Sequence, residues 1–347
     1  MIVKNGPDSL IRLSIVVPCY NEEAVINLTY ADIVDTFKNE PFELEVVFVD
    51  DGSKDRTLEI LRGFSEENPL MRVVSLARNF GHQAAVSAGL TVASGDVIAV
   101  IDADLQDPPS EIIGMLERWK NGAEVVYAVR QERKESVIKR GFYAGFYRLM
   151  SGISDFEFPH DSGDFALMDR RVVDVLNSLP EKNRFIRGLR AWIGFTQVAH
   201  PYARQARQAG DTKYPFRKLL KLAFDGIFNF STVPLTIIFM LGVAATVLAA
   251  FVSLALLVHK ISGLSFFGLN YEDLPGFTSI ILVILFFSGI QIASIGILGE
   301  YIGRMYQESK QRPSYIIRDV NGQIRDVNGQ PQQNQKPING DEKDNID

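Results

Sequence analysis

Val97-Ile98-Ala99-Val100-Ile101-Asp102-Ala103-Asp104-Leu105-Gln106 carries five apolar residues, most of them β-branched, directly into two carboxylates. The apolar run predicts a strand that is buried on both faces. Because side chains alternate along a strand, Asp102 and Asp104 are expected to point the same way. Paired carboxylates at a strand end offer the hard oxygen ligands that Mg²⁺ or Mn²⁺ prefers. A solvated Asp-rich turn is the alternative interpretation.

Strands and helices alternate on both sides of this stretch. The expected strands are 13–17, 44–49, 71–76, 97–101 and 124–129, and the expected helices are 24–39, a second one capped by Ser53 or Asp55 and ending near 67, 83–93 and 108–121. Such alternation indicates an α/β fold with a mostly parallel sheet.

Polar side chains follow the carboxyl ends of these strands, which is where ligands bind in such sheets. They are Tyr20, Glu22, Asp50, Asp51, Arg78, Asp102, Asp104 and Arg130. Asp50 and Asp51 are placed to accept hydrogen bonds from ribose or a base, and for Asp51 helix capping is an equal alternative. Arg130 and Arg133 are suited to grip a pyrophosphate. For Arg133, a solvated charge cluster is the alternative.

Composition excludes several classes of protein. The formal net charge of -6 over 347 residues argues against general nucleic-acid binding. Cys19 is the single cysteine, so no intrachain disulfide can form. The chain has neither a G-x-G-x-x-G after its first strand nor a G-x-x-x-x-G-K-[ST], so a Rossmann dinucleotide site and a P-loop are not supported.

Five motifs in order carry a family resemblance. They are Ile15-Val16-Val17-Pro18-Cys19-Tyr20-Asn21-Glu22, Val49-Asp50-Asp51-Gly52-Ser53, Asp102-Ala103-Asp104-Leu105-Gln106, Asp161-Ser162-Gly163-Asp164-Phe165-Ala166-Leu167 and Gly210-Asp211-Thr212-Lys213-Tyr214. Over roughly residues 10 to 315 the chain resembles inverting family 2 glycosyltransferases of the GT-A fold. It is most similar to the polyisoprenyl-phosphate glycosyltransferases, which include dolichol-phosphate mannose synthase and the bacterial bactoprenol glucosyltransferases.

The resemblance implies roles for the residues at the nucleotide end of the site. Base and ribose would be held by Pro18, Tyr20, Glu22 and Asp51, which with Asp50, Asp102 and Arg130 make up the expected nucleotide-sugar site. The expected ligands of Mg²⁺ or Mn²⁺ are Asp104, Gln106 and Asp102.

The expected catalytic residues are Asp102, Asp104 and Asp164, and the expected acceptor-phosphate residues are Arg207, Lys213 and Arg133. Asp164 is expected in a turn that leads into the apolar run 165–168, where it would orient the acceptor or the metal more than remove a proton. A plain turn is the alternative. Trp192 is preceded by Gly188-Leu189-Arg190-Ala191, so the Gln-x-x-Arg-Trp motif of processive relatives is absent and transfer of a single sugar is expected.

The last third of the chain predicts membrane association. Residues 216–228 have apolar side chains at i, i+3, i+4 and i+7 with basic residues between them, which is typical of an interfacial amphipathic helix. Blocks 233–258 and 274–298 contain no charged residue. Each could span about 37 Å, more than the ~30 Å hydrocarbon core. Basic residues outside the two blocks place both termini in the cytoplasm.

The expected organisation is therefore a cytoplasmic GT-A domain (1–212), a juxtamembrane helix (213–231), two transmembrane helices (232–300) and a partly disordered tail (301–347). The tail contains Ile-Arg-Asp-Val-Asn-Gly-Gln twice, at 317–323 and 324–330, and each Asn-Gly is a hairpin signal.

The expected function is inverting transfer of one sugar, glucose from UDP-glucose, to undecaprenyl phosphate at the cytoplasmic face of the inner membrane, with Mg²⁺ or Mn²⁺. The same chemistry with GDP-mannose or a UDP-amino sugar is an alternative, as is a non-catalytic membrane subunit that binds nucleotide-sugar. A homo-oligomer is compatible with the sequence, and no nucleic-acid partner is expected.

Overall fold

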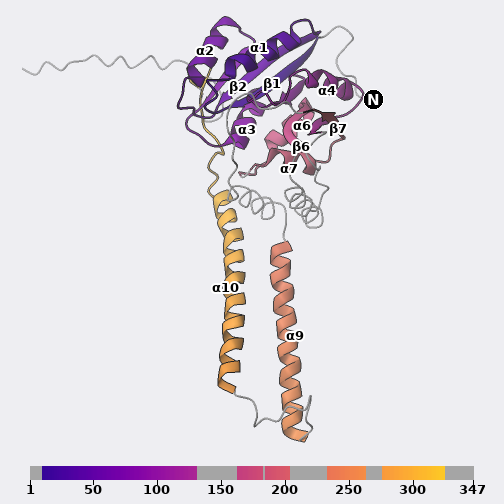
Figure 1. Cartoon of the computed structure of the whole chain (residues 1–347), viewed down its shortest axis with the longest axis vertical. Helices are drawn as coiled ribbons and strands as arrows, with labels where there is room; N and C mark the ends of the chain where they lie inside the picture. The colour runs from indigo at the N-terminus through magenta and orange to yellow at the C-terminus, as the bar shows by residue number, and fades with distance from the viewer. Residues whose placement is uncertain (1–9, 131–161, 183, 204–232, 263–275, 325–347) are drawn as a thin grey trace, which may run out of the picture. The chain divides into compact units, whose positions relative to one another are not determined.

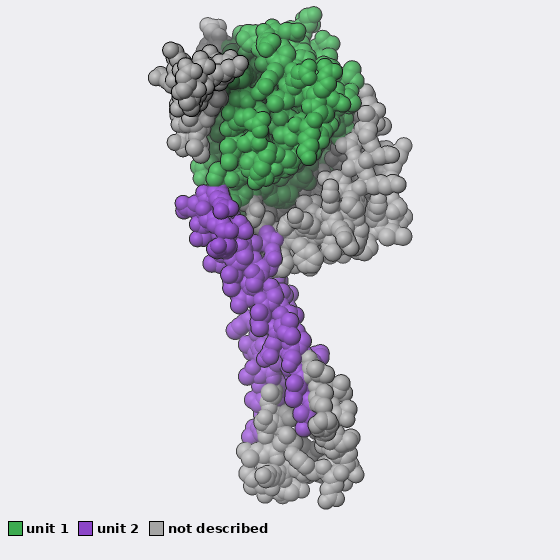
Figure 2. Space-filling view, turned by 90° about the vertical axis from the view of Figure 1, so that its left-hand side faces the viewer, with its two compact units in different colours: residues 1–137, 158–213, 313–347 green, residues 138–157, 214–312 purple. Residues whose placement is uncertain are grey.

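The structure is a computed structural model that describes residues 10–130, 162–182, 184–203, 233–262 and 276–324. The chain divides into two compact units, which Figure 2 colours separately. Unit 1 comprises Met1–Val137, Phe158–Lys213 and Pro313–Asp347, and unit 2 comprises Ile138–Glu157 and Tyr214–Arg312.

Within the described residues, unit 1 is built on a nine-stranded sheet (Figure 1). From one edge to the other the strands are β7 (Gln197–Tyr202), β5 (Val125–Arg130), β6 (Ser162–Asp169), β4 (Val97–Val100), β1 (Ile11–Cys19), β2 (Phe42–Asp50), β3 (Met71–Leu76), β8 (Ile317–Val320) and β9 (Gln323–Ile324). Strands β4, β1, β2 and β3 are mutually parallel, and β7 is parallel to β5. The predicted α/β fold with a mostly parallel sheet is confirmed.

Helices connect these strands and cover both faces of the sheet. They are α1 (Ile26–Phe37), α2 (Thr57–Glu67), α3 (His82–Val92), α4 (Glu111–Lys120), α6 (Arg170–Ser178) and α7 (Ile186–Trp192). The first four lie where the apolar spacing predicts helices, with bounds that differ by a few residues.

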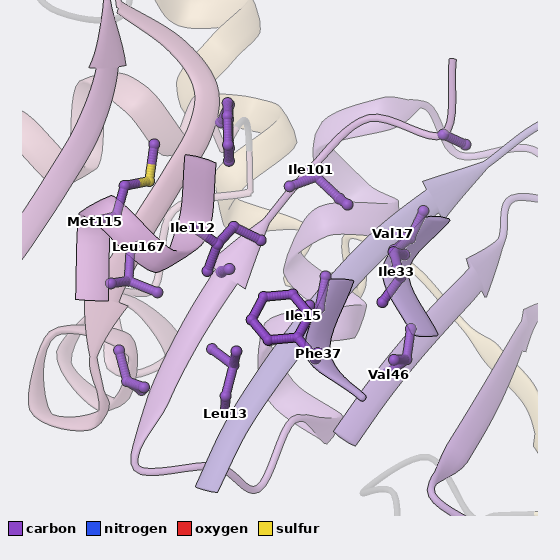
Figure 3. Packing of buried hydrophobic residues seen from close by; sticks show 14 of the residues in the cluster. Leu13, Ile15, Val17, Ile33, Phe37, Val46, Ile101, Ile112, Met115 and Leu167 are labelled. Atoms are coloured by element: carbon purple, nitrogen blue, oxygen red, sulfur yellow. The ribbon is translucent and has the colours of Figure 1, made fainter. Parts of the chain in front are cut away.

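The alternating side chains of β1 show how the core is divided between the two faces. Leu13, Ile15 and Val17 pack against side chains of α1 and α4 in one continuous cluster (Figure 3). Val16 faces the other way, toward α3, where Gly89 makes close approach possible. A Cβ at Gly89 would lie 2.3 Å from Val16 Cγ1. The two apolar faces explain why β4 and the part of β1 from Ile15 to Val17 are apolar without alternating with polar residues.

Strand β6 differs from the expected turn. Residues 162–169 form a strand that is inserted between β4 and β5 and is antiparallel to both. Asp164 therefore lies on a strand and not in a loop, which corrects the prediction. Because β6 runs backwards, its first residues lie at the same edge as the carboxyl ends of β4 and β5. The reversal is what brings Asp164 to the predicted ligand-binding edge.

The segment after α10, residues 313–324, returns to unit 1 and is called the C-terminal strap below. Its strand β8 pairs antiparallel with β3, and β8 and β9 form a hairpin. The turn residues Asn321 and Gly322 have φ values of 49° and 74°, as a type I′ turn requires. The first predicted Asn-Gly hairpin is thus present, while the second repeat lies outside the described residues.

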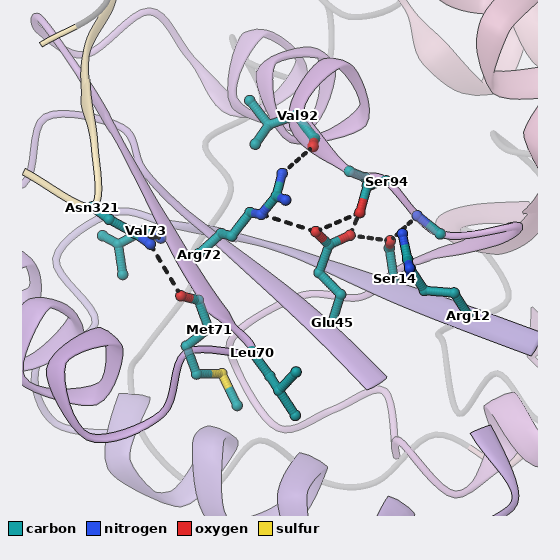
Figure 4. Close-up of polar contacts among 12 residues, drawn as sticks. Arg12, Ser14, Glu45, Leu70, Met71, Arg72, Val73, Val92, Ser94 and Asn321 are labelled. Carbon is teal, nitrogen blue, oxygen red and sulfur yellow. Dashed lines mark hydrogen bonds and ion pairs between the residues drawn. The ribbon is translucent and has the colours of Figure 1, made fainter. Parts of the chain in front are cut away.

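Side chains fasten the C-terminal strap to the sheet. The Asn321 amide oxygen accepts a hydrogen bond from the backbone N–H of Val73 at 2.7 Å, and its amide nitrogen donates to the Met71 carbonyl at 3.4 Å (Figure 4). Asp319 is buried and forms an ion pair with Arg62 at 3.1 Å. Residues 317–324 of the expected tail are therefore edge strands of the sheet.

On the amino-terminal side of the parallel strands, away from their carboxyl ends, the buried carboxylate of Glu45 joins three segments (Figure 4). It accepts hydrogen bonds from the Ser14 hydroxyl and from the backbone and hydroxyl of Ser94, at 2.8 and 2.9 Å for the latter two. Arg72 Nε lies 3.0 Å from Glu45 Oε1. The carboxylate thus ties β1, β2 and β3 to the turn before β4.

Replacing Glu45 by alanine should lower the free energy of unfolding by about 2–3 kcal/mol, because buried donors lose a charged acceptor. Glu43→Ala is the matched control on the same strand. Its ion pair with Arg12 is half exposed, at 3.4 Å, so its removal should cost less than about 0.5 kcal/mol. Chemical denaturation of the full chain in detergent measures both. Equal losses would contradict the role assigned to Glu45.

Unit 2 contains two long helices, α9 (Val233–Ser262) and α10 (Gly276–Ser309), which lie side by side and antiparallel (Figure 1). They carry most of the exposed large apolar side chains of the described residues, among them Phe239, Leu248 and Ile292. By length and composition, one segment in the described part of the chain, Phe286–Ser309, is able to cross a membrane. A shorter apolar segment covers Val233–Leu248.

Candidate functional site

The loops that leave β1 and β2 interlock at the carboxyl edge of the sheet. Asn21, with a φ of 56°, receives a hydrogen bond from Lys54 N at 2.8 Å and donates its own N–H to the Ser53 hydroxyl at 3.0 Å. Glu22 N donates to the Thr57 hydroxyl at 2.8 Å. These bonds hold the two loops that carry the predicted nucleotide residues in one arrangement.

Asp51 is almost completely buried, and it fixes a third loop. Its two carboxylate oxygens accept the N–H groups of Phe80 at 2.7 Å and Gly81 at 2.9 Å. Burial raises the pKa of Asp51 above its ordinary value, and the two amide donors oppose that shift. Asp51 therefore does not act as a helix cap, and it joins the loop after β2 to the loop after β3.

Gly52 explains how closely these two loops approach. Its φ is +68°, and a Cβ at this position would lie 2.6 Å from the backbone carbon of Arg78. No larger residue fits there without displacement of the backbone. Next to it, burial raises the pKa of Asp50, although hydrogen bonds from Ser53 oppose the shift.

The Asp-x-Asp stretch lies beyond the end of β4, in a turn. The buried Ala103 is held by its carbonyl, which accepts the Thr29 hydroxyl at 2.8 Å. Asp102 and Asp104 on either side are partly exposed, and the hydrogen bond from Thr29 ties the turn that carries them to α1. Gln106 N donates to Asp104 Oδ1 at 3.2 Å, which tightens the turn.

Asp164 is the centre of a charged cluster. Arg187 on α7 grips its carboxylate with two nitrogens, Nε at 3.2 Å and Nη2 at 3.1 Å. His82 Nε2 lies 3.2 Å from Asp164 Oδ2, and Gln83 donates to the same oxygen at 3.0 Å. Burial alone would raise the pKa of Asp164, but the charge of Arg187 and the contacts with His82 hold it far below its ordinary value. Asp164 is therefore ionised and a weak proton acceptor.

His82 links this cluster to the Asp-x-Asp turn. Its Nε2 is 3.8 Å from Asp102 Oδ1 as well as 3.2 Å from Asp164 Oδ2. Burial lowers the pKa of His82, but the two carboxylates more than compensate and raise it. For Asp102, burial raises the pKa to about 6, with His82 opposing and neighbouring carboxylates adding to the shift.

The donor set in the Asp-x-Asp turn suits a hard divalent cation in part. It supplies the carboxylates of Asp102 and Asp104 and the amide of Gln106, all on one turn. Among the described residues, no group of three or more His, Cys, Asp or Glu side chains could by itself hold a metal ion. The turn therefore fits a cation that takes its other ligands from substrate phosphates and water, as Mg²⁺ commonly does.

Comparison with known proteins assigns the chain to a family. The family model described as Glycosyl transferase family 2 matches residues 14–176. A glycosyltransferase of Bacillus subtilis (strain 168), YkcC, is 47% identical over 90% of this chain and 95% of its own length. The chain belongs to glycosyl transferase family 2. It is an α/β enzyme of the GT-A type, and the resemblance seen in its motifs is confirmed.

Two further proteins are similar to this glycosyltransferase, one in sequence and one in structure. The prophage bactoprenol glucosyl transferase homolog of Escherichia coli (strain K12) is 40% identical over 89% of this chain and 99% of its own length. The crystal structure of glucosyl-3-phosphoglycerate synthase from Mycobacterium tuberculosis aligns with a TM-score of 0.42 and 21% identity, covering 63% of this chain and 78% of that one.

The glycosyltransferase brings most of the predicted donor-side residues to one edge of its sheet. Pro18 lies within β1, and Tyr20 follows that strand with 41% of its side chain exposed. Glu22, Asp50, Asp51, Asp102, Asp104, Gln106 and Asp164 lie in the turns and strand ends described above. Arg130 is the last residue of β5. Arg133, Arg207 and Lys213 lie outside the described residues.

His82, Gln83 and Arg187 belong to the candidate site through their contacts with Asp164, although the sequence patterns did not predict them there. Arg187 is one of several basic residues that precede the apolar blocks in the sequence, and a histidine at the start of a helix is most often structural. Their common partner Asp164 is about eighty residues from His82, so no spacing rule connects them. The available signal was the position of His82 and Gln83, which begin the helix that follows β3 at the ligand-binding edge.

Proposed function

We propose that this glycosyltransferase transfers one glucosyl residue from UDP-glucose to undecaprenyl phosphate at the cytoplasmic face of the inner membrane. The observation that carries the proposal is the alignment with the bactoprenol glucosyl transferase homolog, at 40% identity over 99% of that protein. An alignment of that extent includes both the GT-A domain and the apolar helices. It therefore covers the parts that a sugar donor and a lipid acceptor each require.

The long helices of unit 2 support a lipid acceptor. We infer that α9 and α10 cross the membrane, with both chain termini in the cytoplasm. Side chains such as Phe239 and Met305 are 66% and 70% exposed, which would be unfavourable in water and is ordinary in lipid. An acceptor with an isoprenoid tail resides in the bilayer, so the enzyme must be held at the level of its phosphate.

The carboxylates of the Asp-x-Asp turn support a cation-assisted reaction. Asp104, Gln106 and Asp102 would hold Mg²⁺ or Mn²⁺, which supplies charge neutralisation for the departing diphosphate. In the transfer, an acceptor phosphate oxygen forms a bond to the anomeric carbon as the bond from that carbon to UDP breaks, with inversion. The second pKa of a phosphate monoester is about 6, so the acceptor is already ionised at neutral pH.

An ionised acceptor makes a strong general base unnecessary, and the state of Asp164 agrees with that. The Asp164 carboxylate is held by Arg187 and His82. It is therefore suited to orient these two cationic side chains near the reacting phosphate rather than to remove a proton. Arg130 and Arg133, together with Arg207 and Lys213, would neutralise the donor and acceptor phosphates, because two anionic substrates must meet in one site.

The test is a transfer assay with the purified full chain in nanodiscs. Undecaprenyl phosphate and Mn²⁺ or Mg²⁺ are present, and labelled UDP-glucose, GDP-mannose and UDP-N-acetylglucosamine are compared. The expected result is a labelled lipid from UDP-glucose alone, formed only when cation and lipid are both added. Labelling from another donor alone would overturn the assignment of glucose. Binding of UDP without transfer from any donor would favour the non-catalytic alternative.

A further inference from the structure

The Asp-x-Asp turn is fastened at its far end by a tyrosine from a distant strand. The Tyr202 hydroxyl donates a hydrogen bond of 2.5 Å to Asp107 Oδ1, and both residues are buried. Asp107 directly follows Gln106, one of the expected cation ligands. The contact joins residues that are 95 positions apart in the chain.

Tyr202 is itself held firmly. It is the last residue of β7 and pairs in register with Arg130, the last residue of β5. Its ring packs edge-on against Phe165, with ring centroids 5.5 Å apart. Because the ring is fixed by the sheet and by Phe165, the hydroxyl presents a defined hydrogen-bond donor to the turn.

The turn is thus held on both sides of Asp104 and Gln106, two of the three expected cation ligands. At one end the Thr29 hydroxyl binds the Ala103 carbonyl at 2.8 Å. At the other end Tyr202 binds Asp107. Asp104 and Gln106 occupy the segment between, which includes Leu105 with a φ of 60°. A turn that contains a residue in the left-handed region depends on its fixed ends to keep its geometry.

We propose that Tyr202, through Asp107, is a positioning residue that holds Asp104 and Gln106 in the arrangement that binds the divalent cation. The inference rests on the proposed function in that it assumes a cation at this turn. Outer partners that orient metal ligands commonly change metal affinity about 10- to 100-fold when they are removed. Tyr202 touches neither cation nor substrate in this proposal.

Tyr202→Phe tests it, because the change removes the hydroxyl and leaves the ring against Phe165. Mn²⁺ is titrated into the full chain in detergent with UDP present, and free Mn²⁺ is followed by its electron paramagnetic resonance signal. The dissociation constant for Mn²⁺ should rise about tenfold. Tyr30→Phe is the matched control: Tyr30 stacks on Phe64 at 4.1 Å, on α1, and its variant should bind Mn²⁺ as the unaltered chain does.

A double-variant measurement separates positioning from general destabilisation. Asp107→Ala should weaken Mn²⁺ binding, and addition of Tyr202→Phe to it should weaken binding no further, because alanine already removes the oxygen that accepts the Tyr202 hydroxyl. Unaltered Mn²⁺ affinity in Tyr202→Phe would overturn the inference, as would fully additive losses.

The proposed function is judged separately, by glucose transfer in the unaltered chain. If that chain transfers glucose and Tyr202→Phe binds Mn²⁺ normally, the positioning role alone is wrong. If it transfers no sugar while Tyr202→Phe still weakens Mn²⁺ binding selectively, the positioning role stands and the proposed reaction is wrong.

Discussion

Asp104→Asn should lower the rate of glucosyl transfer about a thousandfold, equivalent to about 4 kcal/mol of transition-state stabilisation. Asparagine keeps the oxygen that accepts the Gln106 N–H, so the turn retains its shape. What is lost is the negative charge that would hold the cation opposite the departing diphosphate. The initial rate of lipid labelling at saturating UDP-glucose measures the effect.

Asp35→Asn is the control for this prediction. Asp35 is an exposed carboxylate on α1, and it has no part in the site. Its variant should transfer glucose at the unaltered rate. A rate for Asp104→Asn within a few-fold of that control, in buffer with Mg²⁺ or Mn²⁺, would refute the cation role of Asp104.

Asp164→Asn should have the largest effect on stability, a loss of about 3 kcal/mol near neutral pH. The change removes the buried anion that Arg187 and His82 share and leaves the guanidinium without its bidentate partner. Thermal unfolding of the full chain in detergent measures it. Asp174→Asn serves as control, because the Asp174 side chain is 61% exposed and its ion pair with Arg170, at 3.6 Å, should contribute less than about 0.5 kcal/mol.

The stability lost in Asp164→Asn should depend on pH, and the sign of this dependence follows from the lowered pKa of Asp164. A carboxylate with a lower pKa in the folded state stabilises the fold above its unfolded pKa of about 3.9 and loses that contribution as the pH falls. The difference in unfolding temperature between the unaltered chain and Asp164→Asn should therefore grow as the pH falls through neutrality, because His82 becomes protonated beside Asp164, stay level from about pH 6 to about pH 5 and shrink below about pH 4. A difference that grows as the pH falls below about 4 would contradict the assigned state of Asp164.

Local sequence patterns were sufficient to predict the parallel part of the sheet. The buried runs before Asp50 and Asp102 are apolar on both faces, and the helices between them have regular apolar spacing. In a parallel arrangement, all such strands end at one edge. The convergence of Asp51, Asp102 and Asp104 therefore follows from the order of elements alone.

The direction of β6 could not be predicted in this way. An apolar run such as 165–168 fits a central strand in either direction, because side-chain alternation is the same when a strand is reversed. Its insertion between β4 and β5 depends on contacts with distant segments. The partners of Asp164 were missed for the same reason, since His82 and Arg187 reach it from two different helices.

For the C-terminal strap, the sequence predicts the hairpin but not the strand with which it pairs. The turn formed by Asn321 and Gly322 has a local signal, and the hairpin it predicts is present. The choice of β3 as the neighbour depends on the fit of Asn321 and Asp319 to groups about 250 residues away, which no local pattern encodes.

The position of the strap in the chain has a consequence for biosynthesis. The ribosome makes β3 early, but it makes β8 only after α9 and α10 have both been translated. Throughout that interval the hydrogen-bonding groups on the outer side of β3 lack their native neighbour, and an open strand edge of this kind invites pairing with other chains. The catalytic half of the protein is therefore completed last, when the returning segment closes the edge that translation had left open.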